Sequence, residues 1–377
     1  MSSFNLKTQQ DIEDFLAGVA FFGTGGGGDV KVGRDSLNDC LNQGLEMTAL
    51  SPEDIKDDQL FCVPCFVGSI APKTPEVLAE MDFNGYHGRK YGIDEMLIEA
   101  VRRMEAYTGR KADGLMVVEM GGSNSACAMA AAYKMGLPIV DGDQAGRAFP
   151  EASNSMFAIK GYDGFPIVYL DSWGSNVIVV ETSHRTAGER IGKFVSQAAY
   201  GEMATASALR SGEVIKDVVV PGTLTRALAV GTAINRAHEA GNDAGLAAAA
   251  AVEGKLVCRG KLHSLMPEDA KGYYSGTYCI TGEGEFAGHE YKIWFKNENH
   301  ILWVDGVVHT TSPDLISLIN YGTGKPLLNT YLENGLEVGV VISKSTDKYK
   351  TPEGLAGFSP RSLGFDFDYV PYGSVNP

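Results

Sequence analysis

The chain is short of positive charge and has no apolar run long enough to cross a membrane. Its 377 residues carry 32 Lys and Arg against 47 Asp and Glu, a net charge of −15. Such a chain repels nucleic acid and anionic membranes, so we expect neither as a partner. The Ala-rich run 246–252 is far shorter than a bilayer span, and the polar N-terminus does not resemble a signal peptide. We therefore expect a cytoplasmic protein.

Cysteine is also scarce, and the six that occur are too scattered to suggest a disulfide framework. A Cys-x-x-Cys pair, Cys62 and Cys65, could bind metal or do redox work. Both lie inside the apolar run 60–67, and no second Cys pair or His pair is near. We interpret them as reduced core thiols, which suits a cytoplasmic location.

The pattern along the chain predicts an α/β protein of two domains. Hydrophobic residues make up 44% and charged residues 21%, as in ordinary globular proteins. Strand and helix patterns alternate in the first half, whereas short alternating runs with glycine turns dominate from residue 256. We predict an N-terminal α/β domain with a mixed or parallel sheet over residues 1–185. A C-terminal α+β domain, with helices followed by antiparallel strands, would cover residues 186–377.

Residues 115–151 form the most informative stretch. The pattern predicts a strand over 115–118, a helix over 126–134 and a strand over 138–140. The first strand leads into Glu119 and a glycine loop, and the second into Asp141, Gly142 and Asp143. In parallel α/β sheets ligands bind beyond the carboxyl ends of strands, so these acids are site candidates. The alternative is structural, with turns at the glycines and helix caps at the acids.

A second candidate is the glycine run 23–28. Four successive glycines, Gly25, Gly26, Gly27 and Gly28, allow close backbone approach and amides that cradle an oxygen. A plain turn, which needs fewer glycines, is the alternative. No Lys-Ser/Thr pair follows, so we expect no nucleotide.

Local patterns along the chain predict the remaining elements. Thr8 should cap the first helix, residues 68–92 could form a lid, and residues 313–316 should form a short helix or turn. His184 follows a predicted strand, and both a structural role and a place in the site are open for it. The other predictions comprise strands over 60–67, 156–159, 166–170, 176–180 and 214–220, and helices over 186–210, 222–240 and 243–252.

Several motifs occur in an order that resembles a known family. They are GTGGGG (23–28), PIVDGDQAGRAFPE (138–151), NEN (297–299), PDLI (313–316) and Gly-x-x-Pro-Arg (357–361). Together they resemble the S-methyl-thiohydantoin desulfurase family, whose members often accompany hydantoinase and oxoprolinase subunits. The resemblance implies two domains, with the glycine and DGD motifs in the first and NEN and PDLI in the second. It also implies hydrolytic removal of sulfur from a five-membered S-methyl-thiohydantoin ring.

We combine the resemblance with the chemistry of hydrolysis to predict a site. Water needs a base or a metal, so Glu119, Asp141, Asp143 and His184 are the predicted catalytic residues. Asp141, Asp143 and His184 could hold a divalent metal such as zinc. The predicted substrate-binding groups are the amides of Gly25, Gly26, Gly27 and Gly28, Arg147, which could pair with a substrate carboxylate and do so bidentately if exposed, and Asn297 and Glu298 from the second domain.

Other readings remain open from the residues alone. The chain could be an accessory subunit of a hydantoinase- or oxoprolinase-type complex, or an ATP-dependent cyclic amide hydrolase, although the glycine run lacks the usual lysine. A thiolate route through Cys65 or Cys127 is disfavoured by their apolar surroundings. Enzymes of this kind are often closed homo-oligomers, so we expect one here.

Overall fold

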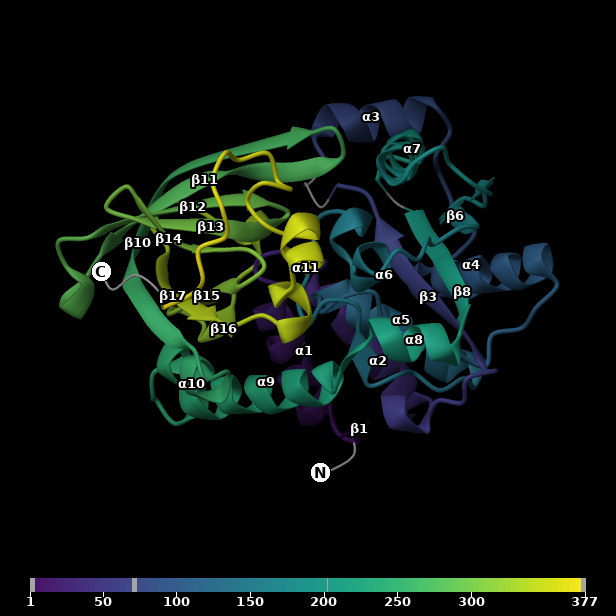
Figure 1. The fold of residues 1–377 in the computed structure, drawn as a ribbon, viewed down its shortest axis with the longest axis horizontal. Coiled ribbons are helices and arrows are strands. Elements are labelled where there is room, and N and C mark those ends of the chain that lie inside the picture. The colour runs from purple at the N-terminus through teal and green to yellow at the C-terminus, as the bar shows by residue number, and fades with distance from the viewer. Residues whose placement is uncertain (1–3, 70–72, 202, 374–377) are drawn as a thin grey trace.

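Two sheets lie on opposite sides of a central group of helices in the computed structural model (Figure 1), which describes residues 4–69, 73–201 and 203–373. The five-stranded sheet belongs to the part with most of the helices, and the eight-stranded sheet forms the other part. This arrangement confirms the predicted α/β class, with a mixed sheet followed by an antiparallel one.

The five-stranded sheet has the order β4-β3-β8-β6-β7. Only β3 and β4 are parallel, and the other pairs are antiparallel. Helices α4 and α5 pack against strands of this sheet, and α2 packs on α5. The bounds are β3 Leu60–Val67, β4 Gly114–Leu115, β6 Ile167–Asp171, β7 Asn176–Val179, β8 Met203–Ser211, α2 Val30–Asn42, α4 Ile93–Thr108 and α5 Gly122–Met135.

Helices α1 (Gln9–Phe22) and α9 (Thr223–Glu239) pack closely between the two sheets. A Cβ at Gly18 would lie 1.7 Å from the carbonyl oxygen of Ala227, so the backbones touch where only glycine fits. Thr8 caps α1 through a capping box with Asp11, as predicted. Ser317, in the second sheet, donates to the carbonyl of Phe21 at 2.7 Å. The end of α1, which leads into the glycine run, is therefore tied to both parts.

The eight-stranded sheet has the order β14-β13-β12-β11-β10-β17-β15-β16 and is antiparallel throughout. Helix α10 (Ala244–Ala251) packs on β10 and β17. The turn between β12 and β13 contains Asn297, and this hairpin reaches the first part of the molecule. The strands are β10 Lys255–Ala270, β11 Tyr273–Gly282, β12 Glu290–Lys296, β13 Glu298–Val304, β14 Val307–Thr311, β15 Leu315–Asn320, β16 Lys325–Pro326 and β17 Glu337–Ser343.

Three of the predicted elements are wrong in type. The helix predicted over 186–210 is α7 (Arg185–Ala198) followed by β8, because Tyr200 and Gly201 turn the chain with φ of 51° and 79°. The strand predicted over 214–220 is helix α8 (Gly212–Val218), and that over 156–159 is helix α6 (Met156–Ile159). Runs this short do not separate strand from buried helix by spacing alone.

Other predictions need smaller corrections. The strand predicted over 115–118 shrinks to β4, and residues 138–140 form only isolated bridges, such as Leu115 with Ile139. The predicted lid 68–92 contains helix α3 (Pro75–Phe83), and its residues 70–72 lie outside the described residues. Of the two alternatives predicted for residues 313–316, the turn is found at 313–314, and Leu315 and Ile316 already belong to β15. The remaining elements are β1 Asn5–Leu6, β2 Met47–Thr48, β5 Gly142–Asp143, β9 Val220–Pro221, α11 Pro352–Gly357 and short 3-10 turns.

The chain crosses between the two parts more than once. Strand β8 lies beyond residue 185 and yet sits at the centre of the first sheet. The predicted domain boundary at residue 185 stays a prediction.

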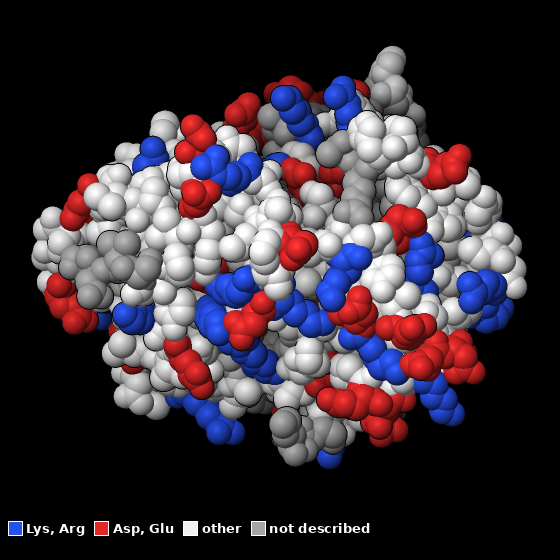
Figure 2. Space-filling view, in the orientation of Figure 1, with Lys and Arg blue, Asp and Glu red and all other residues white. Residues whose placement is uncertain are grey.

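The visible face of the molecule carries both signs of charge. Figure 2 shows Lys and Arg interspersed with Asp and Glu, without a continuous field of one sign over that face. Within the described part of the chain, no helix is both long and apolar enough to span a bilayer.

Candidate functional site

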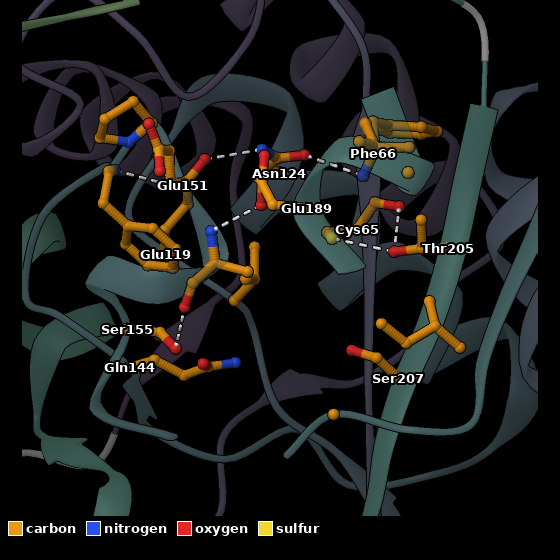
Figure 3. Close-up of a pocket in the computed structure, with 18 of the residues that line it drawn as sticks. Cys65, Phe66, Glu119, Asn124, Gln144, Glu151, Ser155, Glu189, Thr205 and Ser207 are labelled. Carbon is orange, nitrogen blue, oxygen red and sulfur yellow. Dashed lines mark hydrogen bonds between the residues drawn. The ribbon is translucent and has the colours of Figure 1, made fainter. Parts of the chain in front are cut away.

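A cavity of about 320 Å³ opens where the first sheet, the start of α5, α7 and the β12–β13 turn meet. Figure 3 shows how Glu119, Asn124, Cys65 and Glu189 surround this space. Both parts of the molecule contribute, since Asn297 and Glu298 complete the wall. The polar lining includes Cys65, Glu119, Ser123, Asn124, Gln144, Glu151, Ser153, Tyr169, Glu189, Lys193, Thr205, Ser207, Asn297 and Glu298, with Gly27 and Gly28.

Glu119 is the predicted catalytic residue that the structure places in this cavity. It precedes α5, and only 5% of it is exposed. The Asn124 amide donates to its Oε1 at 2.7 Å, and the Phe149 N–H donates to its Oε2 at 2.9 Å (Figure 3). Burial nevertheless raises the pKa of Glu119 to about 7, because desolvation outweighs these donors.

Glu298, the first residue of β13, brings a second buried carboxyl to the same cavity. Burial and then the nearby Glu119 raise its pKa well above the ordinary value. Its Oε2 has no hydrogen-bond partner among the described residues, and His300 Nε2 lies 3.9 Å away. A Cβ on Gly26 would lie 2.0 Å from Oε1, so this glycine leaves room for the carboxyl.

The two carboxyl groups can therefore take different roles at one pH. Two acids that repel each other in a desolvated site hold their protons unequally. Burial raises the pKa of Glu119 to about 7 and that of Glu298 well above its ordinary value, so Glu298 is the group that favours its protonated form. One group can then accept a proton and the other can donate one, which is the pairing that hydrolysis requires.

The glycine run reaches the cavity with its second half. Gly27 and Gly28 line it with φ of 77° and 86°, and a Cβ on Gly27 would lie 2.4 Å from Gly121 Cα. The Asn124 N–H donates to the Gly27 carbonyl at 3.2 Å, which joins the loop to α5.

The first half of the run is structural. The Gly26 N–H donates to Gly23, and the Gly25 carbonyl accepts from Asn329. The Gly26 amide was expected to donate to the substrate. This expectation is corrected, because its N–H already donates within a turn.

Asn297 lies in the turn between β12 and β13, at φ of 59°. Its Oδ1 accepts from the Tyr274 N–H at 3.0 Å, and its carbonyl accepts from the Asn329 amide. Asn297 therefore lines the cavity, as predicted from sequence, while also holding the turn that presents Glu298.

Arg147 is not exposed, so the condition for its predicted bidentate pairing with a substrate carboxylate is not met, and it is absent from the cavity lining. Its side chain is fully buried and spans both parts of the molecule. It donates to the Thr24 hydroxyl at 2.9 Å, the Asn299 carbonyl at 3.2 Å and the Asp314 carbonyl at 2.8 Å. The Phe358 ring lies 5.1 Å from the guanidinium carbon. Arg147 is a buried link, because its fork of donors satisfies the backbone turns that meet there.

Asp141 and His184 also lie outside the cavity lining. Asp141 accepts from the Leu224 and Thr225 N–H groups at 3.0 and 3.1 Å, and so caps the start of α9. His184 is exposed and caps α7, with Nδ1 accepting from the Ala187 N–H at 3.2 Å. The structural alternative for Asp141 therefore describes its position better than the catalytic role.

Asp143 is buried within a turn, accepting from Gly146 and Ala145 N–H groups. Burial raises its pKa to about 7, and Glu119 adds a smaller increase. It is absent from the cavity lining. Asp141, Asp143 and His184 thus belong to separate caps and turns.

The described residues do not fit the predicted metal site. They contain no group of three or more His, Cys, Asp or Glu side chains that could hold a metal ion. The ligand set Asp141, Asp143 and His184 is therefore corrected. A bound divalent metal stays a prediction, which metal analysis of protein purified without a metal-affinity tag would test.

The cysteine prediction holds for Cys62 and needs correction for Cys65. Cys62 is buried, whereas Cys65 lines the cavity with its Sγ 3.1 Å from Thr205 Oγ1. Burial raises the pKa of Cys65 to about 11 and that of Cys127 further. Both are thiols near neutral pH, which disfavours thiolate attack.

Sequence reasoning missed the contribution of α7. Glu189 and Lys193, one turn apart on this helix, both line the cavity. Their spacing of four on a predicted amphipathic helix was visible, but the face that would meet the site was not. It also missed His300, which is buried and whose Nδ1 lies 2.7 Å from Ser312 Oγ.

The fold defines a class of two-part α/β proteins, here with a cavity lined by residues of both parts. A family model described as S-Me-THD-like, N-terminal domain, matches residues 10–181. A second, described as S-Me-THD-like, C-terminal domain, matches residues 183–372. The chain therefore belongs to the S-Me-THD-like family, which confirms the resemblance found from the motifs.

The fold itself recurs in a solved structure. A crystal structure of a protein from Chromobacterium violaceum is 21% identical and superposes with a TM-score of 0.75. The match covers 98% of this chain and 100% of that chain, so it shows the same fold. No curated protein matches the chain.

Proposed function

We propose that this protein is a hydrolase that removes sulfur from a small five-membered S-methyl-thiohydantoin-like ring. The observation that carries the proposal is the pair of buried carboxyls, Glu119 and Glu298, in one cavity between the two parts. The family supports the ring chemistry. A cavity of about 320 Å³ is at the small end of ligand sites, which suits a compact ring.

The reaction proceeds in two steps with the protein's own groups. First, the oxygen of water bonds to the ring carbon that carries sulfur, and Glu119 takes one proton from that water. Glu298 gives its proton to the ring nitrogen as the C=N double bond becomes single. The product of this step is a tetrahedral carbon that carries both hydroxyl and sulfur.

In the second step the carbon–sulfur bond breaks. Glu119 returns its proton to the leaving sulfur, and Glu298 takes the proton of the hydroxyl as a C=O bond forms. The products are a hydantoin ring and a thiol, and both carboxyls return to their starting states. The positive end of the α5 dipole, beside Ser123 and Asn124, favours negative charge on the substrate in this cavity.

The test is release of methanethiol from an S-methylated thiohydantoin by the purified chain alone. Glu119→Gln and Glu298→Gln should each lower turnover by roughly 10² to 10⁴-fold, the usual contribution of a general acid or base. Glu105→Gln is the matched control, since Glu105 is also buried but pairs with Lys111 outside the cavity. A wild-type chain without turnover would favour the accessory-subunit reading. Full turnover in both site variants would overturn the assignment.

A further inference from the structure

His300 is a fully buried histidine beside the carboxyl pair, and the reaction described above does not use it. It lies on β13, two positions after Glu298. The centre of its ring is 5.7 Å from that of Trp294 and 5.9 Å from that of Phe358. Because close packing leaves the imidazole little freedom to turn, each ring nitrogen keeps its own set of neighbours.

The position of the His300 proton follows from a chain of hydrogen bonds that starts at Arg147. Arg147 Nη1 donates to Ser312 Oγ at 3.2 Å, and Ser312 Oγ lies 2.7 Å from His300 Nδ1. A guanidinium can only donate, so Ser312 accepts from Arg147 and has its own hydroxyl hydrogen left for His300. Nδ1 is therefore the acceptor. Burial, and then the charge of Arg147, lower the pKa of His300 well below its ordinary value, so the ring is neutral and carries its proton on Nε2.

Two oxygens lie near the Nε2–H group of His300. The Lys296 carbonyl oxygen is 3.2 Å away and Glu298 Oε2 is 3.9 Å away. The second distance is about 1 Å longer than an ordinary hydrogen bond. Glu298 Oε2 has no hydrogen-bond partner among the described residues. When Glu298 gives its proton to the ring nitrogen of the substrate, this buried oxygen becomes part of a carboxylate, which is costly without a donor. His300 Nε2–H is the donor that the structure places beside it.

We propose that His300 is a positioning residue whose Nε2–H turns from the Lys296 carbonyl to Glu298 Oε2 when Glu298 becomes a carboxylate. This inference rests on the proposed function and adds to it the group that stabilises the ionised acid. Hydrogen bonds to charged acceptors are stronger than those to neutral ones, so the contact favours the state in which Glu298 has given up its proton. Arg147 and Ser312 keep the histidine proton on Nε2, and they thereby make this donor available.

Two substitutions separate this role from a purely structural one, with kcat and KM for methanethiol release as the readout. The amide nitrogen of His300→Gln can take the place of Nε2, so this variant keeps a donor toward Glu298 and loses the acceptor for Ser312. The amide oxygen of His300→Asn can take the place of Nδ1, so this variant keeps the acceptor and loses the donor. We expect kcat to fall roughly 10- to 100-fold in His300→Asn with KM little changed, and to fall much less in His300→Gln.

The opposite order is expected if His300 only holds Ser312 in place. His309→Asn is the matched control, because His309 is also a buried histidine of the second sheet and is absent from the cavity lining. Its Nδ1 lies 2.9 Å from Thr310 Oγ1, a contact like that of His300 with Ser312. This variant should keep the wild-type kcat.

Nitrogen-15 NMR of histidine-labelled wild type reads the proton position without any turnover. The signals that disappear in His300→Gln identify His300, whose Nε2 should have the shift of a protonated nitrogen and Nδ1 that of an unprotonated one. A proton on Nδ1, or a kcat in His300→Asn equal to or above that in His300→Gln, overturns the inference and leaves the hydrolase proposal standing. Wild type that releases no methanethiol overturns the hydrolase proposal, and the NMR shifts decide the proton position of His300 in either case.

Discussion

At the scale of single residues, the chemistry depends on where two carboxyl groups are held. Glu119 is oriented by Asn124, whose Oδ1 also accepts from the Phe66 N–H at 3.1 Å, so β3 and α5 position it together. Glu298 is held instead by its tight fit against Gly26. The first acid is thus placed by hydrogen bonds and the second by packing, which gives each a different sensitivity to substitution.

We predict that Gly26→Ala lowers turnover by roughly tenfold to a hundredfold while the protein stays folded. The added methyl group would overlap Glu298 Oε1 and move the carboxyl from its place, and small misplacements at a reacting centre cost this much. Turnover and far-ultraviolet circular dichroism are measured together. Gly92→Ala is the control, since its nearest neighbour, Glu95 Oε2, would lie 3.4 Å away. Equal activity in both variants would contradict the tight fit.

The rate should also depend on pH in one direction near neutrality. The pKa of Glu119 is raised to about 7, so its basic form is gained as pH rises through that value. Turnover should increase as pH rises through about 7, because Glu119 gains its basic form there, and the raised pKa of Glu298 moves the loss of its proton above the ordinary carboxyl range. A pH–rate profile of kcat measures this. A profile that falls between pH 6 and 8 would exclude Glu119 as the base.

At the scale of elements, helix ends and strand ends meet at the cavity. The start of α5 faces it, the turn after β12 enters it, and α7 covers it. Asp141 instead caps the start of α9. Helix α9 packs on α1, which leads into the glycine run. A motif next to the site can therefore stabilise the element that carries the site without taking part in chemistry.

We predict that Asp141→Ala lowers the free energy of unfolding by about 1–2 kcal/mol and leaves turnover nearly unchanged below the unfolding transition. The loss follows from removing the acceptor for the first N–H groups of α9. Chemical denaturation and the methanethiol assay provide the two readouts. Asp141→Asn keeps an acceptor oxygen and should lose less stability. A large fall in turnover without a fall in stability would restore Asp141 as a catalytic residue.

At the scale of the whole molecule, the cavity exists only while the two parts stay joined. Arg147 is central to that joint, since its guanidinium reaches Thr24, Asn299 and Asp314. Ser317 and Phe21 form a further link. The site residues come from both sides of this joint, so loss of the joint would disperse them.

We predict that Arg147→Met destabilises the protein by about 3–5 kcal/mol, as expected when one member of a buried polar network is removed. Several buried carbonyls would lose their donor. Arg147→Lys should recover little, because one ammonium cannot reach all of these acceptors. Thermal unfolding of both variants provides the measurement. Near wild-type stability in Arg147→Met would return this arginine to a binding role.

The homo-oligomer expected from the sequence stays a prediction, which light scattering would test.

Much of this protein could be predicted from the sequence because its patterns are local. Hydrophobic spacing predicted α1, β3 and the antiparallel strands, and the glycine run and NEN motif indicated segments that do reach the cavity. Glu119 was found because it follows an apolar run and precedes glycines. The same local logic assigned Asp141 and Arg147 to the site, since it detects a polar residue in a motif but not the direction of its side chain.

By itself the sequence therefore determined the family, the α/β class and the segments around the site. Only the tertiary structure decided that residues 203–211 form a strand, because β8 gains its partners from β3 and β6 on either side. Only the tertiary structure paired Glu119 with Glu298, which are 179 positions apart in the numbering (298 − 119). It also brought Lys193 to the same cavity. Burial and the neighbouring charge set the pKa of each acid, and both depend on which distant segments fold together.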